Sequence, residues 1–583
     1  MAGRTQHGIA WLIAGTAGEG LESGGETFAR ALAALGYKPT TQRDFPSRIR
    51  GGDTTFTVRL TPDGRLVPPA HIDLALAFNE TVLARLDARL RRHSLLLVDE
   101  GVKPLVPTSG ASVQEFPFTK LATAAGLARA KNMVALGASA ALLGVDLATL
   151  SGSVDEQFHD KGEKVVAQNR AALKAGFDEA VKRFGATPRY KAPAPGKAPA
   201  LFLSGNEAVS IGALAAGCRV AAAYPITPAS DILEYMTPRL QALGGTALQM
   251  EDELAACNLL VGASFAGAKT LTATSGPGLS LMTEALGLAG SAETPIVVID
   301  CQRPGPSTGM PTKHGQEDLW HLVHGGHGEH VRVVLAPTDV ADAFHATSEA
   351  FRLAEEFRCP AFVAMDQQQS LFKQTVAPFD LQAEAARHAP RKPNHIAAGA
   401  NAWDHQYSAY YGDGTEHPVR VALPGEPGGR HYANSTEHAP NGFTNEDPKV
   451  RNEMVERRLR RMDTIVKYAK DPVVVEGPGD AKVALVSWGS TVEACREAAE
   501  RLATAGVKAK VVGVRLLWPF PREAFAAAVG SLPLIVAEAN AFAQLARLIK
   551  SELPVHDRLR TVLQYDGRTM ASDAIVDAVE ATR

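Results

Sequence analysis

Short apolar runs alternate with amphipathic segments over three stretches of the chain. The first stretch contains the runs IAWLIAG and LLLVD, the second RVAAAY, TLTATS and PIVVIDC, and the third KVALVSWGS and PLIVAEA. Most of these runs precede a segment in which apolar residues recur at helical spacing. This rhythm is typical of parallel sheets covered by helices on both faces. The sequence therefore predicts an α/β protein with three doubly wound domains, in which ligands bind at the carboxyl ends of the strands.

Two changes in composition mark the predicted domain boundaries. The tract TPRYKAPAPGKAPA is rich in Pro, Ala and Lys, and we expect an extended linker over residues 187–200. A second stretch, residues 378–475, is rich in Gly, Pro, Asn and His and predicts an irregular linker. Its later part, residues 450–470, has the spacing and charge of an exposed connecting helix. The predicted domains are then residues 1–186, 201–377 and 476–583.

Charge and composition exclude several classes of protein. The 583 residues carry 60 Lys and Arg against 63 Asp and Glu, and this near balance argues against a nucleic-acid or acidic-membrane partner. No apolar run reaches the about 20 residues that span a bilayer. The five cysteines are scattered without a C-x-x-C pair, so we expect no metal, iron–sulfur or zinc site held by this chain alone. Their odd number and the lack of a secretion signal indicate that the protein is located in the reducing cytoplasm.

A Gly-rich turn follows the first predicted strand. Gly15, Gly18 and Gly20 have the spacing G-x-x-G-x-G, which departs from the dinucleotide-binding fingerprint. Such a turn presents backbone N–H groups to a phosphate, but a tight structural turn explains the pattern equally well. Downstream, Arg48 and Arg50 lie beside a flexible turn and could hold a phosphate or an acidic loop of a neighbouring subunit.

Thr227 lies between two prolines in the segment YPITPAS, directly after the strand RVAAAY. The prolines restrict the backbone and would hold the Thr227 hydroxyl rigidly at the end of the strand. The alternative is that Thr227 caps the helix that Pro228 begins, and the local pattern by itself favours this alternative.

Three acids, Glu251, Asp252 and Glu253, head the next apolar helix. Acids in a first turn normally complement the helix dipole, and this explains at least two of them. An acid that faces inward would be a carboxyl in a dry site, with a raised pKa and the capacity for proton exchange.

A long loop, CQRPGPSTGMPTKHG, follows the strand PIVVID. Arg303 lies near the carboxyl end of this strand, where a guanidinium can bind a carboxylate through two parallel hydrogen bonds. Lys313 and His314 add positive or switchable charge to the loop. The alternative is a solvated arginine in a surface loop, although loops of this length in compact domains are often functional.

Four segments in this order, YPITPAS, QMEDELAACNLLVGASFAGA, TATSGPGLSLMTEALG and CQRPGPSTGMPTKHGQEDLW, resemble the pyrimidine-binding domain of 2-oxoacid:ferredoxin oxidoreductases. The resemblance covers nearly the whole chain, with a gamma-type domain over 1–186 and a transketolase C-terminal-like domain after 476. It is greatest to the alpha subunits that act on 2-oxoglutarate and carry the gamma domain at the N-terminus. The four motifs together outweigh the local alternatives for Thr227 and Arg303.

The resemblance implies oxidative decarboxylation of a 2-oxoacid on thiamine diphosphate, with acyl transfer to coenzyme A. Electrons leave through [4Fe-4S] clusters to ferredoxin, and the reverse reaction fixes CO2, as in a reductive TCA cycle. The resemblance also implies that Glu253 hydrogen-bonds N1′ of the aminopyrimidine and favours the imino tautomer that removes the thiazolium C2 proton. Thr227 would bind oxygens of the substrate, and Arg303 would pair with its carboxylate.

Substrate choice and coenzyme A binding are predicted from charge. 2-Oxoglutarate has a second carboxylate, for which Lys313 is the first candidate, whereas pyruvate needs no such group and a branched-chain substrate needs an apolar pocket. For coenzyme A, the candidates are groups of the gamma-type domain with phosphate-binding chemistry: Gly18, Arg48 and Arg50.

Gly412, Asp413 and Gly414, with Asn441 downstream, match the motif by which thiamine enzymes bind Mg2+ and diphosphate. That motif needs a buried strand before the Asp and a helix after it, and the surrounding segment predicts neither, so we interpret the match as a coincidence. The diphosphate, the Mg2+ and the clusters should then belong to a separate beta subunit in an (alpha-beta)2 heterotetramer. The competing hypotheses are a non-catalytic scaffold and a self-sufficient thiamine enzyme that uses the GDG segment.

Overall fold

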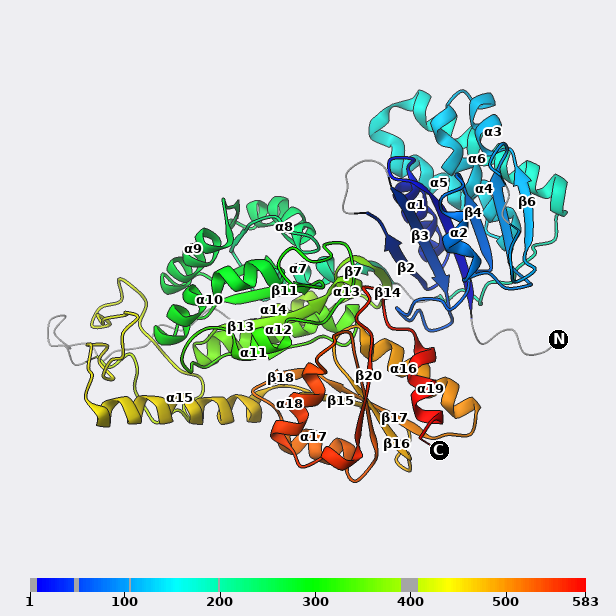
Figure 1. Ribbon diagram of the computed structural model, residues 1–583. Helices are drawn as coiled ribbons and strands as arrows, with labels where there is room; N and C mark the ends of the chain where they lie inside the picture. The colour runs from blue at the N-terminus through cyan, green and yellow to red at the C-terminus, as the bar shows by residue number, and fades with distance from the viewer. Residues whose placement is uncertain (1–7, 47–51, 104–105, 198–199, 389–406, 583) are drawn as a thin grey trace. The chain divides into compact units, whose positions relative to one another are not determined.

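Two compact units make up the computed structural model, which describes residues 8–46, 52–103, 106–197, 200–388 and 407–582 (Figure 1). The first, called the N-terminal unit, comprises Met1–Leu203 and Phe372–Pro378. The second, called the main unit, comprises Ser204–Leu371 and Phe379–Arg583. No helix in these ranges is long and apolar enough to cross a membrane.

Strand β1 (Ile9–Thr16) is the central strand of the N-terminal unit and is buried on both faces. Its odd-numbered side chains, such as Trp11, pack with helix α1 (Leu21–Ala34), and its even-numbered ones, such as Leu12, pack with α2 (Leu83–Asp87). The period of two along a strand therefore divides one apolar run between two cores.

The sheet of the N-terminal unit is only partly parallel. Its order is β6-β5-β4-β1-β3-β2-β14-β7, in which β1, β4, β5 and β6 are parallel but β3 is antiparallel to both β1 and β2. The prediction of a doubly wound parallel domain is therefore correct for one half of this sheet. The other elements are β2 (Pro39–Asp44), β3 (Asp53–Leu60), β4 (Leu74–Ala77), β5 (Leu95–Asp99), β6 (Ser112–Phe116), α3 (Phe118–Ala124), α4 (Lys131–Leu143), α5 (Leu147–Phe158) and α6 (Glu163–Phe184).

Two short strands at the edge of this sheet come from beyond the predicted linker. They are β7 (Leu201–Ser204) and β14 (Lys373–Val376), and β14 pairs antiparallel with β2. The chain therefore leaves the N-terminal unit at Leu203 and contributes Phe372–Pro378 to it later. Edge strands this short carry little pattern in the sequence.

The main unit contains a seven-stranded sheet of order β18-β12-β13-β11-β10-β8-β9. Its strands β8 to β13 pair in parallel, as the strand–helix rhythm predicts. The strands are β8 (Val220–Ala223), β9 (Thr246–Gln249), β10 (Thr270–Thr274), β11 (Val297–Gln302), β12 (Val333–Leu335), β13 (Ala361–Asp366) and β18 (Leu516–Trp518). The helices are α7 (Gly205–Ala215), α8 (Ser230–Ala242), α9 (Glu253–Phe265), α10 (Gly276–Ser291), α11 (Leu319–His324), α12 (Val340–Phe357), α13 (Gln367–Leu371) and α14 (Leu381–Arg387).

A second sheet in the main unit has the order β15-β17-β16-β19-β20 and is parallel except for β15. Its strands are β15 (Val473–Glu476), β16 (Val483–Ser487), β17 (Ala509–Val514), β19 (Leu534–Glu538) and β20 (Leu559–Leu563). Its helices are α16 (Thr491–Thr504), α17 (Arg522–Val529), α18 (Gln544–Glu552) and α19 (Ser572–Glu580).

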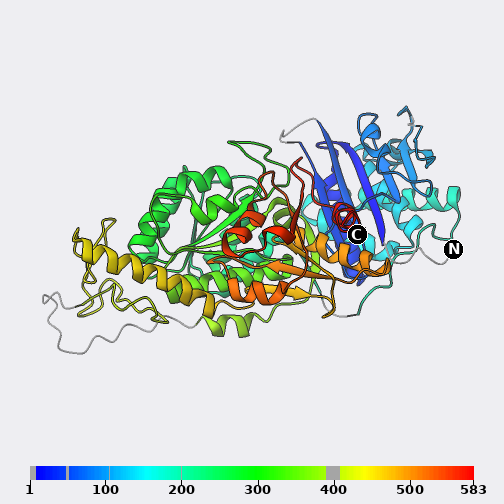
Figure 2. The same ribbon diagram turned by 60° about the horizontal axis from the view of Figure 1, so that its bottom comes forward.

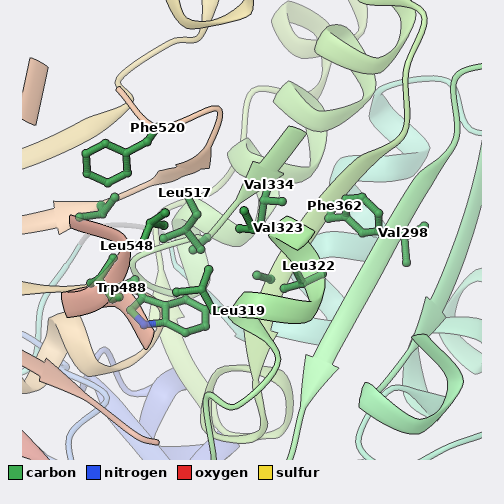
Figure 3. Packing of buried hydrophobic residues seen from close by; sticks show 14 of the residues in the cluster. Val298, Leu319, Leu322, Val323, Val334, Phe362, Trp488, Leu517, Phe520 and Leu548 are labelled. Carbon is green, nitrogen blue, oxygen red and sulfur yellow. The ribbon is translucent and has the colours of Figure 1, made fainter. Parts of the chain in front are cut away.

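One apolar cluster joins the two sheets of the main unit (Figure 3). Leu319 and Leu322 of α11 lie between Val298 and Phe362 of the first sheet and Trp488 and Leu548 of the C-terminal segment (Figure 3). Burial of this continuous surface fixes α11, and with it the loop that precedes α11, against both sheets.

Helix α15 (Pro448–Tyr468), which is one continuous helix in Figure 2, is exposed over most of its surface, as its charge predicts, but it buries one face. Arg457 and Arg461 are buried, and both bind Glu293, which follows α10. The Arg461 Nη1 to Glu293 Oε2 distance is 2.8 Å. Burial opposes ionisation, but the guanidinium groups of Arg461 and Arg457 outweigh it and lower the pKa of Glu293 to about 2. The prediction of an exposed helix is therefore correct for most of its surface but misses the buried face, because Arg457 and Arg461 were taken as solvated.

We predict that Glu293→Ala destabilises the main unit by roughly 3–5 kcal/mol, because two buried guanidinium groups lose their counter-charge. Chemical denaturation followed by circular dichroism measures the loss. Glu456→Ala, which removes an exposed partner of Arg460 on the same helix, should cost less than about 1 kcal/mol.

The same ion cluster predicts a pH dependence. Because the pKa of Glu293 falls from 4.5 to about 2 on folding, its stabilisation is complete above the unfolded value and is lost as the pH decreases toward 2. The stabilities of the wild type and Glu293→Ala should therefore converge on acidification. A difference that stays constant would contradict this assignment.

Candidate functional site

The three acids that head α9 have three different environments. Asp252 is the N-cap and accepts a hydrogen bond from Ala255 N at 2.7 Å, and Glu251 is exposed. Glu253 is the first helical residue, and only 5% of its surface is exposed. The local pattern left open whether one of these acids faces inward, and in the structure Glu253 does.

The carboxyl group of Glu253 lies against the first turn of α10. A Cβ atom built on Gly278 would be 2.4 Å from Glu253 Oε1 and 2.1 Å from Thr274 Oγ1, so only glycine fits at position 278. No side chain in the described ranges forms an ion pair with Glu253. A buried carboxyl without a counter-ion, beside a helix N-terminus, is suited to hydrogen-bond a ligand atom that gains or loses a proton.

Arg303 and Thr227 lie together at the carboxyl ends of β11 and β8. Arg303 Nη1 donates a hydrogen bond to Thr227 O at 2.7 Å, and the arginine is 7% exposed. Its Nε–H has no hydrogen-bond partner among the residues that the structure covers. The alternative of a solvated surface arginine is therefore wrong. A buried guanidinium with an unused N–H at a strand end is suited to bind an anion.

Thr227 does not cap a helix. Helix α8 begins at Ser230, and both Ala229 N and Ser230 N donate to Ile226 O, at 2.7 and 3.1 Å. The segment is also held from α7, because Asn206 Nδ2 donates to Pro228 O at 2.8 Å. Thr227 is thus available at the edge of the site, and the local capping alternative is wrong.

The loop between Arg303 and α11 is held by Gln316, which sequence reasoning missed. Its side-chain amide donates to Asp366 Oδ2 and Trp488 O, both at 3.0 Å, and its Oε1 accepts from Ala539 N at 3.0 Å and Thr491 Oγ1 at 3.1 Å. Gln316 is fully buried, and its partners come from both sheets of the main unit. A lone glutamine in a loop carries no signal of such a role.

Lys313 and His314 lie on the same loop in different environments. Lys313 is half-buried, whereas the ring of His314 is buried, with Nδ1 at 3.6 Å from Asp366 Oδ1. Burial lowers the pKa of His314, against the opposing effect of Asp366. His314 is therefore neutral and does not supply the switchable charge that the sequence predicts. The backbone N–H of His314 donates a hydrogen bond to Gly567 O at 3.1 Å, and this bond ties the loop to the C-terminal segment.

Two carboxyl groups beside Arg303 also escaped the sequence analysis. Asp300, in β11, is fully buried, and neither of its oxygens has a hydrogen-bond partner in the described part of the chain. Burial, with the nearby Asp318, raises the pKa of Asp300 well above its usual range. Burial, followed by Glu317, raises the pKa of Asp318 to about 7, although Arg303 opposes the shift. An aspartate inside the apolar run PIVVID was the one available signal.

The Gly-rich turn of the N-terminal unit is occupied by the chain's own carboxylate. Glu19 Oε2 accepts a hydrogen bond from Thr16 N at 2.7 Å, and Glu19 Oε1 pairs with Lys131 Nζ at 2.6 Å. Gly18 has a φ of 99°, and a Cβ there would meet no atom within 4 Å. Its predicted contact with coenzyme A stays a prediction, and Arg48 and Arg50 lie outside the described residues.

Asp413 of the GDG segment lies in an exposed turn. Its Oδ1 accepts hydrogen bonds from Thr415 N at 3.0 Å and Thr415 Oγ1 at 2.6 Å. No strand precedes it within 407–412, and Asn441 is used locally, accepting from Phe443 N at 3.1 Å. The segment therefore lacks the strand and helix that the Mg2+ and diphosphate motif requires.

All five cysteines are buried and unpaired with one another. Burial raises the pKa of Cys218 to about 12, and the same cause acts on the other thiols: Cys257, Cys301, Cys359 and Cys495. The cysteines thus behave as small apolar core residues.

Three family models match the chain in the predicted order. Residues 10–179 match the pyruvate ferredoxin/flavodoxin oxidoreductase model, and residues 211–457 match the thiamine diphosphate-binding model of pyruvate flavodoxin/ferredoxin oxidoreductases. Residues 473–553 match the transketolase C-terminal domain. These matches confirm three α/β domains of gamma, thiamine-binding and transketolase C-terminal type.

Curated relatives and one solved structure match over nearly the full length. The alpha subunit of 2-oxoacid:ferredoxin oxidoreductase 2 from Aeropyrum pernix is 30% identical over 98% of this chain and 97% of the relative. The 2-oxoglutarate oxidoreductase subunit KorA of Mycobacterium tuberculosis is 30% identical, over 97% of this chain and 90% of its own. The 2-oxoglutarate:ferredoxin oxidoreductase from Magnetococcus marinus superposes with a TM-score of 0.90 at 33% identity, covering 98% of this chain and 99% of that one. The chain belongs to the 2-oxoacid:ferredoxin oxidoreductase family, as an alpha subunit.

Proposed function

We propose that the chain is the alpha subunit of a 2-oxoglutarate:ferredoxin oxidoreductase. The complex would interconvert 2-oxoglutarate, coenzyme A and oxidised ferredoxin with succinyl-CoA, CO2 and reduced ferredoxin. The observation that carries the proposal is Arg303, a buried guanidinium anchored on Thr227 O, with an unpartnered N–H at the carboxyl end of β11. This arrangement suits the 2-oxoacid group, whose carboxylate would pair with Arg303 and whose oxygens would reach Thr227.

The relatives support 2-oxoglutarate over other 2-oxoacids. The Magnetococcus marinus structure has 2-oxoglutarate, coenzyme A and succinyl-CoA bound. A general 2-oxoacid enzyme is the second candidate, because the Aeropyrum pernix relative carries that broader name. Lys313, on the loop that Arg303 begins, is our proposed partner for the second carboxylate of 2-oxoglutarate.

Thiamine diphosphate, when bound, supplies the carbanion and the electron sink of the reaction. The residues of this chain fit its pyrimidine ring, since Glu253 is a buried carboxyl without a counter-ion in the described ranges and Gly278 leaves room for that carboxyl at the first turn of α10. We propose that Glu253 holds a proton at N1′ of the ring. The low exposure of Glu253 would keep water from competing for that hydrogen bond.

We assign the diphosphate, its Mg2+ and the iron–sulfur cluster to a beta subunit. Two observations support this division: the cysteine thiols are buried with raised pKa values, and Asp413 lies in an exposed turn. The assembly would be an (alpha-beta)2 heterotetramer that reduces ferredoxin. Coenzyme A would contact the N-terminal unit, where Gly18 leaves its backbone open to a ligand.

We predict that the purified chain alone has no 2-oxoacid-dependent activity and that the complex with its beta subunit does. Reduction of a viologen dye in the presence of coenzyme A measures the activity. Activity of the chain alone would contradict our interpretation of Asp413 and favour a self-sufficient enzyme. A complex that forms but reduces no dye with any 2-oxoacid would favour the scaffold hypothesis.

Two substitutions test the position of the Glu253 carboxyl. Glu253→Gln should lower turnover of the complex at least about 100-fold, because the amide cannot exchange a proton with the ring. Glu251→Gln is the matched control, since that side chain is exposed, and it should keep normal turnover.

Gly278→Ala tests the same carboxyl without changing it. The added methyl group would occupy the space of Glu253 Oε1 and Thr274 Oγ1, and the displaced carboxyl should lower turnover on the order of 100-fold. Gly287→Ala lies on the same helix with no atom within 4 Å of the new methyl group, and it should be neutral. Normal turnover in Gly278→Ala or Glu253→Gln would remove Glu253 from the site.

Substrate choice is tested at Lys313. Lys313→Ala should raise the KM for 2-oxoglutarate roughly 10-fold or more, because a charge-assisted hydrogen bond is lost, and leave the KM for pyruvate unchanged. Lys482→Ala, on an exposed lysine, is the control. An unchanged ratio of kcat/KM values for the two substrates would contradict the assignment of Lys313.

A further inference from the structure

The carboxyl end of β11 contains one buried cation and two carboxyl groups that the proposed mechanism does not use. Arg303 follows β11 directly, Asp300 lies within it, and Asp318 precedes α11. We propose that Asp318 takes up a proton from solvent when the substrate binds. This inference rests on the proposed binding of a 2-oxoacid at Arg303. The proton returns to solvent on release, and no bond of the substrate is made or broken in this step.

Asp300 is the neutral member of the carboxyl pair. It is fully buried, and neither oxygen accepts a hydrogen bond among the residues covered by the structure. In the sheet it lies between Thr274 of β10 and Ala364 of β13, which offer it no cation. A carboxyl in such a place retains its proton, because its ionised form would have neither solvent nor a partner.

Asp318 is held in place through its backbone and by the shape of α10. Its N–H donates to Gln302 Oε1 at 3.1 Å. A Cβ built on Gly276 would be 2.7 and 2.8 Å from its two carboxyl oxygens, so the carboxyl group lies directly on the first turn of α10. Its Oδ2 is sealed from solvent and has no hydrogen-bond partner among the residues that the structure describes. The carboxyl is therefore positioned without a strong ion pair that would keep it charged.

The charged groups around Asp318 determine how it responds to an anion. Arg303 and the Gly276 N–H stabilise its charged form, whereas burial and Glu317 destabilise it. Glu317 is itself engaged, accepting a hydrogen bond from Gly305 N at 2.8 Å. From α9, Glu253 reaches the neighbouring Gly278. The balance of these effects leaves Asp318 with a pKa of about 7, so that a small change in charge alters its protonation.

A substrate carboxylate on Arg303 is such a change. It would offset the cation that stabilises the Asp318 carboxylate and add a like charge beside it, and both effects raise the pKa of Asp318. The linkage then requires that the substrate bind more tightly at low pH and more weakly as the pH rises through the pKa of the bound state. Burial lowers the pKa values of His314 and His321 and thus opposes proton uptake by these nearby histidines.

Isothermal titration calorimetry of the alpha–beta complex tests the proposal. The ligand is 2-hydroxyglutarate, which keeps both carboxylates but has no carbonyl carbon for the cofactor to attack. Titrations in two buffers of different ionisation enthalpy give the number of protons taken up. We expect uptake of a fraction of a proton per site near pH 7, because binding raises the pKa of Asp318.

Substitutions assign the uptake to one carboxyl group. Asp318→Asn should abolish the proton uptake and flatten the dependence of affinity on pH. If this variant does not fold, Asp318→Ser tests the same expectation. Asp300→Asn is the matched control, because it keeps a neutral group at the other buried carboxyl and should retain the uptake.

The outcomes separate this inference from the proposed function. Absence of binding by 2-oxoglutarate and its analogue would contradict the substrate site at Arg303. Binding without proton uptake between about pH 6 and 8, or uptake that persists in a folded Asp318 variant, would overturn the role of Asp318 and leave the site intact.

Discussion

The hydrogen bonds of Gln316 are the interaction on which the site depends. The side chain is fully buried, and its amide group binds Asp366, Trp488, Thr491 and Ala539. Because an unsatisfied buried polar group is costly, the loop can adopt this position only when both sheets of the main unit are formed. The loop carries Lys313 before Gln316 and Asp318 after it. The second sheet thus supports a site that lies on the first.

Helix α10 connects the two charged clusters of the main unit. Its first turn contacts the carboxyl groups of Glu253 and Asp318, and its last turn leads to Glu293, which binds the arginines of α15. Acids at the N-terminus and arginines at the C-terminus both complement the dipole of the helix. The clusters differ in balance. The cluster at Glu293 joins two guanidinium groups to one carboxylate and stabilises the fold, whereas the carboxyl groups of Asp300 and Asp318 have no salt bridge in the described part of the chain.

Much of the fold follows from the sequence pattern. Apolar runs such as LLLVD and PIVVID are strands, and the helices that follow them begin where capping residues and glycines indicate, as at Asp252. The errors have a common cause. Helix α15 is charged and yet buries Arg457 and Arg461, and β14 joins a sheet in the N-terminal unit from the far end of the sequence. Both features depend on partners that are distant in the chain, which a local pattern does not contain.

The sequence by itself determined the α/β class and the order of the domains through its periodicity, and it indicated the family and the candidates Thr227, Glu253 and Arg303 through the resemblance of four motifs. Only the tertiary structure showed that Arg303 is anchored on Thr227, that His314 is neutral, and that Gln316, Asp300 and Asp318 belong to the site. The reason is physical. The pKa of a side chain and its hydrogen-bond partners depend on groups that folding brings near it, often more than 100 residues away, and burial changes their electrostatic effect.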